Sequence, residues 1–105
     1  MADAALPGHD IAVGGALLPG HEIVDAGLDD LRAGRWTASA FAVLEARPRL
    51  ERAGVTVPDV AVERPSHRLY AILEEEDPAT AHGRHHAILR RTLSYARAAE
   101  RAARR

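Results

Sequence analysis

The sequence contains no cysteine and no lysine, and only four of its 105 residues are aromatic. Without cysteine the chain has no disulfide, no thiolate metal ligand and no cysteine nucleophile. No apolar run approaches the roughly 18 residues that a membrane-spanning helix needs. The first residues carry no positive charge and therefore lack the basic start of a signal peptide. These absences predict a cytoplasmic protein that does not enter the membrane.

The residues that are present favour a helical fold. Hydrophobic residues make up 47% of the chain, which is enough to build a core. Alanine is abundant and has the highest helix propensity, whereas the scarce aromatic residues are the ones that favour strands. A chain of 105 residues has room for one small domain. The composition therefore predicts a single all-α domain.

Glycine, proline and the spacing of apolar residues divide the chain into two parts. Residues 1–18 contain two Gly-containing turns and no helical or strand period, which predicts an irregular N-terminal arm. From residue 19 onward, apolar residues recur at helical spacing between proline and glycine breaks. We therefore predict a helical domain over residues 19–105, a small bundle of four to five helices that ends in a long helix from Pro78 to near Arg105.

Two of the predicted helices have clear boundaries. An amphipathic helix is expected over residues 19–33, with Gly34 as its C-terminal cap. Thr37 is the expected N-cap of the next helix. Because residues 38–44 carry no charge, we expect this helix to be buried on most sides. An extended connector around Pro58 then leads to a helix that Pro65 opens.

A short unit with the pattern Pro-Gly-His-acid occurs twice near the N-terminus. Leu6–Ile11 and Leu18–Ile23 share this pattern twelve residues apart. Two histidines and two carboxylates of this kind could reach one metal ion, but Pro-Gly is also ordinary turn chemistry ahead of a helix. Two copies are too few for a repeat architecture.

Charges of one sign cluster along the chain although the net charge is only −1. Residues 1–31 contain six acids and no arginine, residues 74–77 are all acidic, and residues 78–105 contain seven arginines and one acid. Such segments can satisfy one another within a molecule or across a dimer, or they can face separate partners. The acidic run lies at a helix C-terminus, where it opposes the dipole, so we expect Arg84 or an arginine of another chain to pair with it.

The last predicted helix separates apolar from basic residues. One face carries the apolar and small side chains Ile88, Leu89, Thr92, Tyr95, Ala96, Ala99 and Ala103. The opposite face carries the predicted partner-binding arginines Arg90, Arg91, Arg97 and Arg101. A merely solvated face and an acidic protein surface both fit this pattern. Nucleic acid is disfavoured as the partner because the net charge is near zero and no recognition motif or interleaved aromatic residue is present.

The histidines of the same helix form the main candidate for a metal site. His82 and His86 are four residues apart, so their imidazoles can reach one divalent ion, and His67 of the preceding helix is a candidate third ligand. A divalent metal is thus the only cofactor that the sequence suggests. Surface histidines and a pH-sensitive partner contact remain alternatives. Gly83 inside this helix suggests close packing at that position.

No arrangement of residues has the pattern of an enzyme active site. The serines do not occur in a Gly-x-Ser-x-Gly turn, and the glycines do not have the spacing of a phosphate loop. Whether the chain is an enzyme is therefore left open. The preferred hypothesis is a small non-catalytic interaction protein, an accessory subunit, adaptor or regulator that binds a protein partner or a second copy. The alternatives are a helical metal-binding protein or metalloenzyme and a helical DNA-binding regulator.

Overall fold

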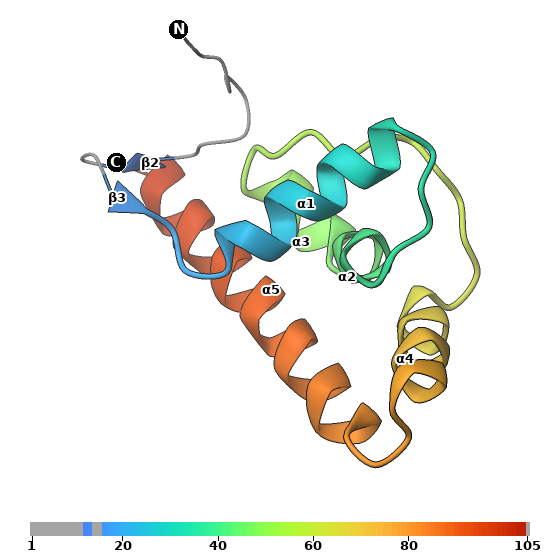
Figure 1. Cartoon of the computed structure of the whole chain (residues 1–105). Helices are drawn as coiled ribbons and strands as arrows, with labels where there is room; N and C mark the ends of the chain where they lie inside the picture. The colour runs from blue at the N-terminus through green and yellow to red at the C-terminus, as the bar shows by residue number, and fades with distance from the viewer. Residues whose placement is uncertain (1–11, 14–15, 105) are drawn as a thin grey trace, which may run out of the picture.

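Residues 12–13 and 16–104 are described by the computed structural model, and they form an all-α fold of five helices with a long C-terminal helix (Figure 1). The predicted fold class is thereby confirmed. The helices are α1 (His21–Arg32), α2 (Ala38–Glu45), α3 (Arg47–Arg52), α4 (Pro65–Glu76) and α5 (Ala81–Ala103).

The described residues begin with a pair of very short strands. β2 (Ala12–Val13) pairs antiparallel with β3 (Ala16–Leu17), which the predicted irregular arm did not include. Residues 1–11 and 14–15, with the first Pro-Gly-His-acid unit, lie outside the described residues. The second unit forms the start of α1, where Gly20 adopts a φ of 79° and a Cβ in its place would overlap the Arg91 carbonyl of α5.

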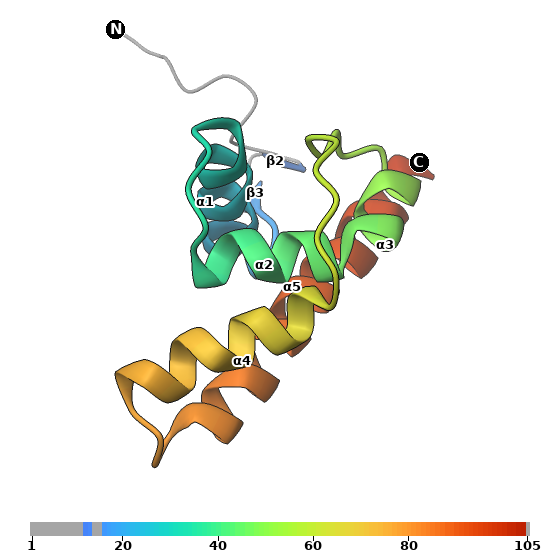
Figure 2. The same cartoon turned by 90° about the vertical axis from the view of Figure 1, so that its right-hand side faces the viewer.

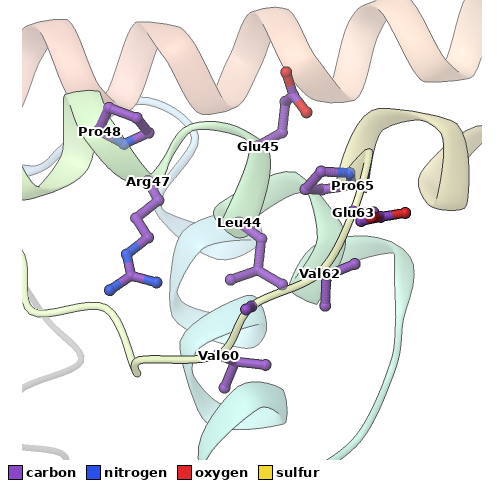
Figure 3. Close-up of a pocket in the computed structure, with 9 residues that line it drawn as sticks. Leu44, Glu45, Arg47, Pro48, Val60, Val62, Glu63 and Pro65 are labelled. Carbon is purple, nitrogen blue, oxygen red and sulfur yellow. The ribbon is translucent and has the colours of Figure 1, made fainter.

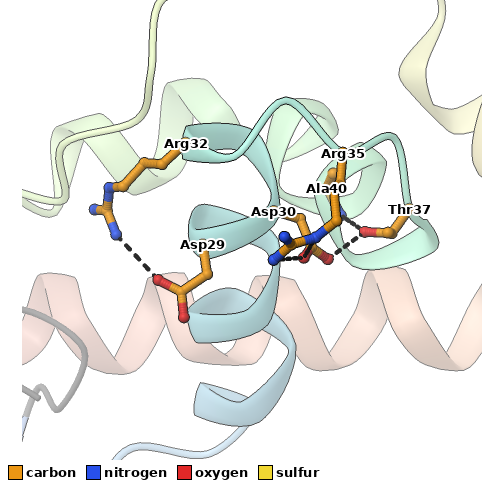
Figure 4. A network of polar contacts seen from close by, with 6 residues as sticks. All are labelled: Asp29, Asp30, Arg32, Arg35, Thr37 and Ala40. Atoms are coloured by element: carbon orange, nitrogen blue, oxygen red, sulfur yellow. Dashed lines mark hydrogen bonds and ion pairs between the residues drawn. The ribbon is translucent and has the colours of Figure 1, made fainter.

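The connection between α1 and α2 is fixed by side-chain hydrogen bonds (Figure 4). The Thr37 hydroxyl accepts a bond from the Ala40 amide at 3.1 Å, which confirms Thr37 as the N-cap of α2. The same hydroxyl donates to Asp30 of α1 at 2.6 Å, and Arg35 donates to that carboxylate at 2.9 Å. The hydrogen bond from Thr37 is the main cause that lowers the pKa of Asp30.

Helix α2 is the centre of the fold, as its lack of charge predicts. Its residues 40–44 are all buried, and it contacts each of the other four helices. α1 packs tightly against it at Gly27, where a Cβ would overlap the carbonyl of Ser39 and the side chain of Val43. Glycine at this position therefore lets two backbones meet in the core.

Helix α4 is held at its first turn by a residue of α2. Pro65 provides no amide hydrogen, and the next amide, that of Ser66, donates to the Glu45 carboxylate at 3.1 Å. The connector between α3 and α4 contains no helix or strand. Its extended form agrees with the prediction from the proline at residue 58.

Helix α5 begins three residues later than predicted. The Asp77 carboxylate accepts bonds from the Ala79 amide at 3.1 Å and from the Thr80 hydroxyl at 2.9 Å. These bonds form a turn that delays the helix to Ala81, so the prediction of a start at Pro78 was wrong. The 23 residues of α5 span about 35 Å.

The two ends of α5 have different neighbours. Figures 1 and 2 show α1 and α3 beside its C-terminal part, while α4 lies against its beginning and the turn between α4 and α5 projects away from the other helices. Within the described part of the chain, no helix is both long and apolar enough to cross a membrane.

Candidate functional site

Three arginines line up on the outer face of α5. Arg90, Arg97 and Arg101 are exposed and occupy positions i, i+7 and i+11. At 100° and 1.5 Å per residue, they fall within a sector of about 40° and span about 16 Å of the helix. We call these three residues the arginine ladder.

The arginine ladder differs from most other arginines in its lack of partners. Arg84 of α5 pairs with Glu76 at 2.9 Å, which confirms the predicted partner of the acidic run. Arg104 lies 3.5 Å from Glu100. No described residue forms an ion pair with the three ladder arginines, so their charges stay available to another molecule.

Arg91, the fourth predicted partner-binding residue, is engaged within the fold. Its guanidinium forms an ion pair with Glu22 in the first turn of α1. This contact joins the acidic N-terminal region to the basic C-terminal helix, one of the outcomes that the charge pattern allowed. Because this ion pair already occupies its guanidinium, we leave Arg91 out of the ladder.

The inner face of α5 anchors the ladder to the core. Of the predicted apolar face, Thr92, Tyr95, Ala96 and Ala99 are buried, whereas Ala103 is exposed. Ile88 and Leu89 are half-buried. Among the described residues the Tyr95 hydroxyl has no hydrogen-bond partner, and burial raises its pKa to about 12. This buried face fixes the rotation of α5, and thereby the direction in which the ladder points.

The predicted metal ligands lie in two places. The rings of His82 and His86 are parallel, with centroids 6.4 Å apart, and both residues are exposed. His67 instead lines a cavity between α4 and α5 together with His85. Over the residues that the structure describes, no three histidine, aspartate or glutamate side chains are arranged to hold a metal ion. Gly83 has no neighbour within 4 Å of a Cβ built on it, so the close packing predicted there was wrong.

His85 fastens α5 to the start of α4. Its Nε2 donates to the Ser66 carbonyl oxygen at 3.0 Å, and the Ser66 hydroxyl oxygen lies 3.0 Å from the same nitrogen. A carbonyl oxygen only accepts, so the proton is on Nε2. With that proton in place, His85 cannot take a proton from the Ser66 hydroxyl, and the pair does not form a nucleophile with its base.

The cavity beside His85 is lined by residues whose proximity was not predicted from the sequence. Its volume is about 480 Å³. From α4 it is lined by Ser66, His67, Tyr70, Ala71 and Glu74. The sequence indicates that three of these residues share one face of α4, because Ser66, Tyr70 and Glu74 follow one another at four-residue steps. Which residue of α5 lies across the cavity from this face depends on the tertiary fold.

A second cavity, of about 510 Å³, lies beside the connector (Figure 3). Leu44, Val60 and Val62 give it an apolar wall, while Glu45 projects away from them. Arg47 also lines it and is bound by Glu51 at 3.1 Å. Two of the charged residues that line this cavity, Glu45 and Arg47, already form hydrogen bonds or ion pairs within the fold.

The one exposed tryptophan is part of the packing around α2. Trp36 is 53% exposed and lies parallel to Phe41, with ring centroids 5.7 Å apart. The Arg68 guanidinium of α4 lies 5.9 Å from the centre of the same Phe41 ring. Both residues thus cover the start of α2.

Comparison with known proteins adds no assignment to this geometry. No protein-family model, no curated protein and no solved structure matches the chain.

Proposed function

We propose that this protein is a small non-catalytic interaction protein that binds an acidic protein surface through the arginine ladder. The observation that supports the proposal most is the combination of three exposed guanidiniums in one narrow sector with the absence of an ion pair to any described residue. Arginine is among the residues that contribute most to binding at protein interfaces. Its planar group also pairs with carboxylates through two parallel hydrogen bonds.

The rigidity of α5 favours binding through this surface. The backbone of the ladder belongs to one helix, and the inner face of that helix is buried at Thr92, Tyr95 and Ala96. A partner therefore meets three arginines whose backbone positions are fixed before binding, so that only their side chains lose freedom on association. An acidic helix is the simplest partner, since its carboxylates can repeat at the same spacing.

The test is the binding of a designed helical peptide to the full chain, which isothermal titration calorimetry measures. The peptide has three glutamates on one face at the spacing of the ladder, and a control peptide has the same composition with the glutamates spread around the helix. We expect the matched peptide to bind about tenfold more tightly, since each exposed ion pair contributes about 0.2–1 kcal/mol. Added salt should weaken this binding.

Charge reversal in the protein completes the test. Arg97→Glu should abolish the preference for the matched peptide. Arg52→Glu is the matched control, because Arg52 of α3 is also exposed and has no ion pair with a described residue. Equal loss of binding in both variants would indicate general electrostatic attraction and contradict the proposal. So would a DNA duplex that binds the ladder more tightly than the peptide at the same salt concentration.

A further inference from the structure

The cavity between α4 and α5 has the size of a small-molecule site. Its volume of about 480 Å³ lies within the roughly 300–1,000 Å³ that is usual for such sites. Its α4 side is one continuous face of the helix, and its α5 side is His85. None of the ladder arginines lines it, so the cavity is separate from the surface of the function proposed above.

Two aromatic rings form adjoining walls of this cavity. The rings of Tyr70 and His85 are nearly perpendicular, at 83°, and their centroids are 5.4 Å apart. The bond from His85 Nε2 to the Ser66 carbonyl holds the imidazole in place. It also leaves the other ring nitrogen as a hydrogen-bond acceptor. The walls are therefore oriented before any ligand enters.

The charge of the cavity favours a cation. Glu74 is exposed and forms no ion pair with a described residue, and no arginine belongs to the lining. The Glu74 carboxylate is the one acidic group among the lining side chains. Aromatic faces attract cations as well, because the face of a ring is its electron-rich side.

We propose that this cavity binds a small methylated ammonium ion. The aromatic walls of Tyr70 and His85 would contact its methyl groups, and Glu74 would balance its charge. Perpendicular aromatic walls with a nearby carboxylate suit such an ion, which is bulky, weakly hydrated and unable to donate strong hydrogen bonds. A divalent metal fits less well, because no three ligands converge anywhere in the described part of the chain.

The probes are choline and its neutral isostere 3,3-dimethylbutan-1-ol, which differ in charge and hardly in shape. Amide resonances of the full chain are followed by NMR as each probe is added. We expect choline to shift the signals of Ser66, Tyr70, Ala71 and His85 in a saturable way, while the isostere leaves them in place. Equal shifts from both probes would show apolar binding only, and the absence of saturable shifts would show no site; both results overturn the proposal.

Matched substitutions assign the binding to the cavity. Glu74→Gln should weaken choline binding about threefold to fivefold, the effect of one exposed ion pair. Glu75→Gln removes the same charge one residue away, outside the lining, and should leave the affinity unchanged. Equal weakening by both variants would assign the effect to the general acidity of α4 and overturn the proposal.

A second pair of variants tests the aromatic walls. His85→Ala should weaken choline binding about threefold, whereas His86→Ala, on the exposed side of α5, should have no effect. If His85→Ala disturbs the helix pair, which circular dichroism would reveal, Tyr70→Leu replaces it, since leucine fills a similar space without an aromatic face. Unchanged binding in Tyr70→Leu would contradict the aromatic contact.

The same ammonium group occurs in free small molecules and on trimethylated lysine. Comparison of choline with a short peptide that contains trimethyllysine distinguishes these sources. Tighter binding of the peptide would assign the cavity to a modified protein tail, and tighter binding of choline would assign it to a free metabolite. A peptide and a choline that both fail to saturate would overturn the proposal.

Discussion

The two halves of α5 differ in what surrounds them. The C-terminal half contributes Thr92, Tyr95, Ala96, Ala98 and Ala99 to the buried core. Between residues 82 and 91 no side chain is fully buried. α4 reaches this first half at Arg84 and His85, whereas α1 and α3 reach the helix at Arg91 and beyond. One helix therefore joins a packed core to a thinner two-helix extension (Figures 1 and 2).

The difference between the halves matches the distribution of candidate functional groups. The cavity with His67 and His85 lies in the extension, where incomplete packing leaves space. Two residues of the arginine ladder, Arg97 and Arg101, are on the core half, whose inner face is firmly packed. A cavity needs space, and a docking surface for a rigid partner needs a fixed backbone. The two halves supply these conditions separately.

The largest effect is expected from truncation in the core half. Tyr95 has no exposed surface and is the largest fully buried side chain. Tyr95→Ala should lower the free energy of unfolding by about 3–5 kcal/mol, since it removes the ring and leaves a cavity. Urea denaturation followed by circular dichroism measures this change. A loss below about 1 kcal/mol would show that the centre of the core is elsewhere.

A smaller effect is expected from ionisation of the same residue at high pH. The pKa of Tyr95 is raised from 10.0 to about 12, so the unfolded chain releases this proton before the folded chain does. Stability from this group is present below pH 10 and falls as the pH rises toward 12, by up to about 2 kcal/mol.

Tyr95→Phe is the control for this loss. It should remove the Tyr95 contribution to the alkaline decline without loss of stability at neutral pH, because no residue that the structure describes forms a hydrogen bond with the hydroxyl. Urea denaturation at pH values on both sides of 10 compares the two chains. If the free energy of unfolding fell equally above pH 10 in the wild type and in Tyr95→Phe, the raised pKa of Tyr95 would be contradicted.

Two glycine substitutions should change stability with opposite signs in the two regions. Gly27→Ala should destabilise by about 1–3 kcal/mol, because the new methyl group overlaps the Ser39 carbonyl and Val43 in the core. Gly83→Ala should stabilise by about 0.5–1 kcal/mol, because space is free around it and alanine favours the helix. Thermal denaturation of both variants would show the contrast. A change in stability of the same sign in both variants would contradict the difference in packing between the two regions.

Local patterns in the sequence predicted most of the fold. The uncharged residues 38–44 indicated a buried helix, and Thr37 indicated where it begins, because both signals depend only on neighbouring residues. The start of α5 was misplaced for a local reason as well, since Asp77 forms a turn with Thr80 instead of capping a helix at Pro78.

Long-range contacts explain what the sequence did not predict. Ser66 binds Glu45 of α2 and His85 of α5, residues 21 and 19 positions away. The spacing of the histidines favoured His82 with His86, yet His85 is the one that faces α4, because the rotation of α5 follows from its buried face. A pattern within one helix cannot predict which residue of another helix lies across from it. The four predicted arginines were likewise separated only by the fold, which pairs Arg91 with Glu22.

The most direct test of the docking proposal is a charge exchange between the arginine ladder and its peptide partner. The three ladder arginines are replaced by glutamate, and the three glutamates of the matched peptide are replaced by lysine. We predict that either change alone abolishes the binding measured by calorimetry and that the two changes together restore it to within about tenfold, since the ion pairs re-form with reversed polarity. Failure of the exchanged pair to bind, with the fold of the variant intact, would contradict the assignment of the arginine ladder as a docking surface.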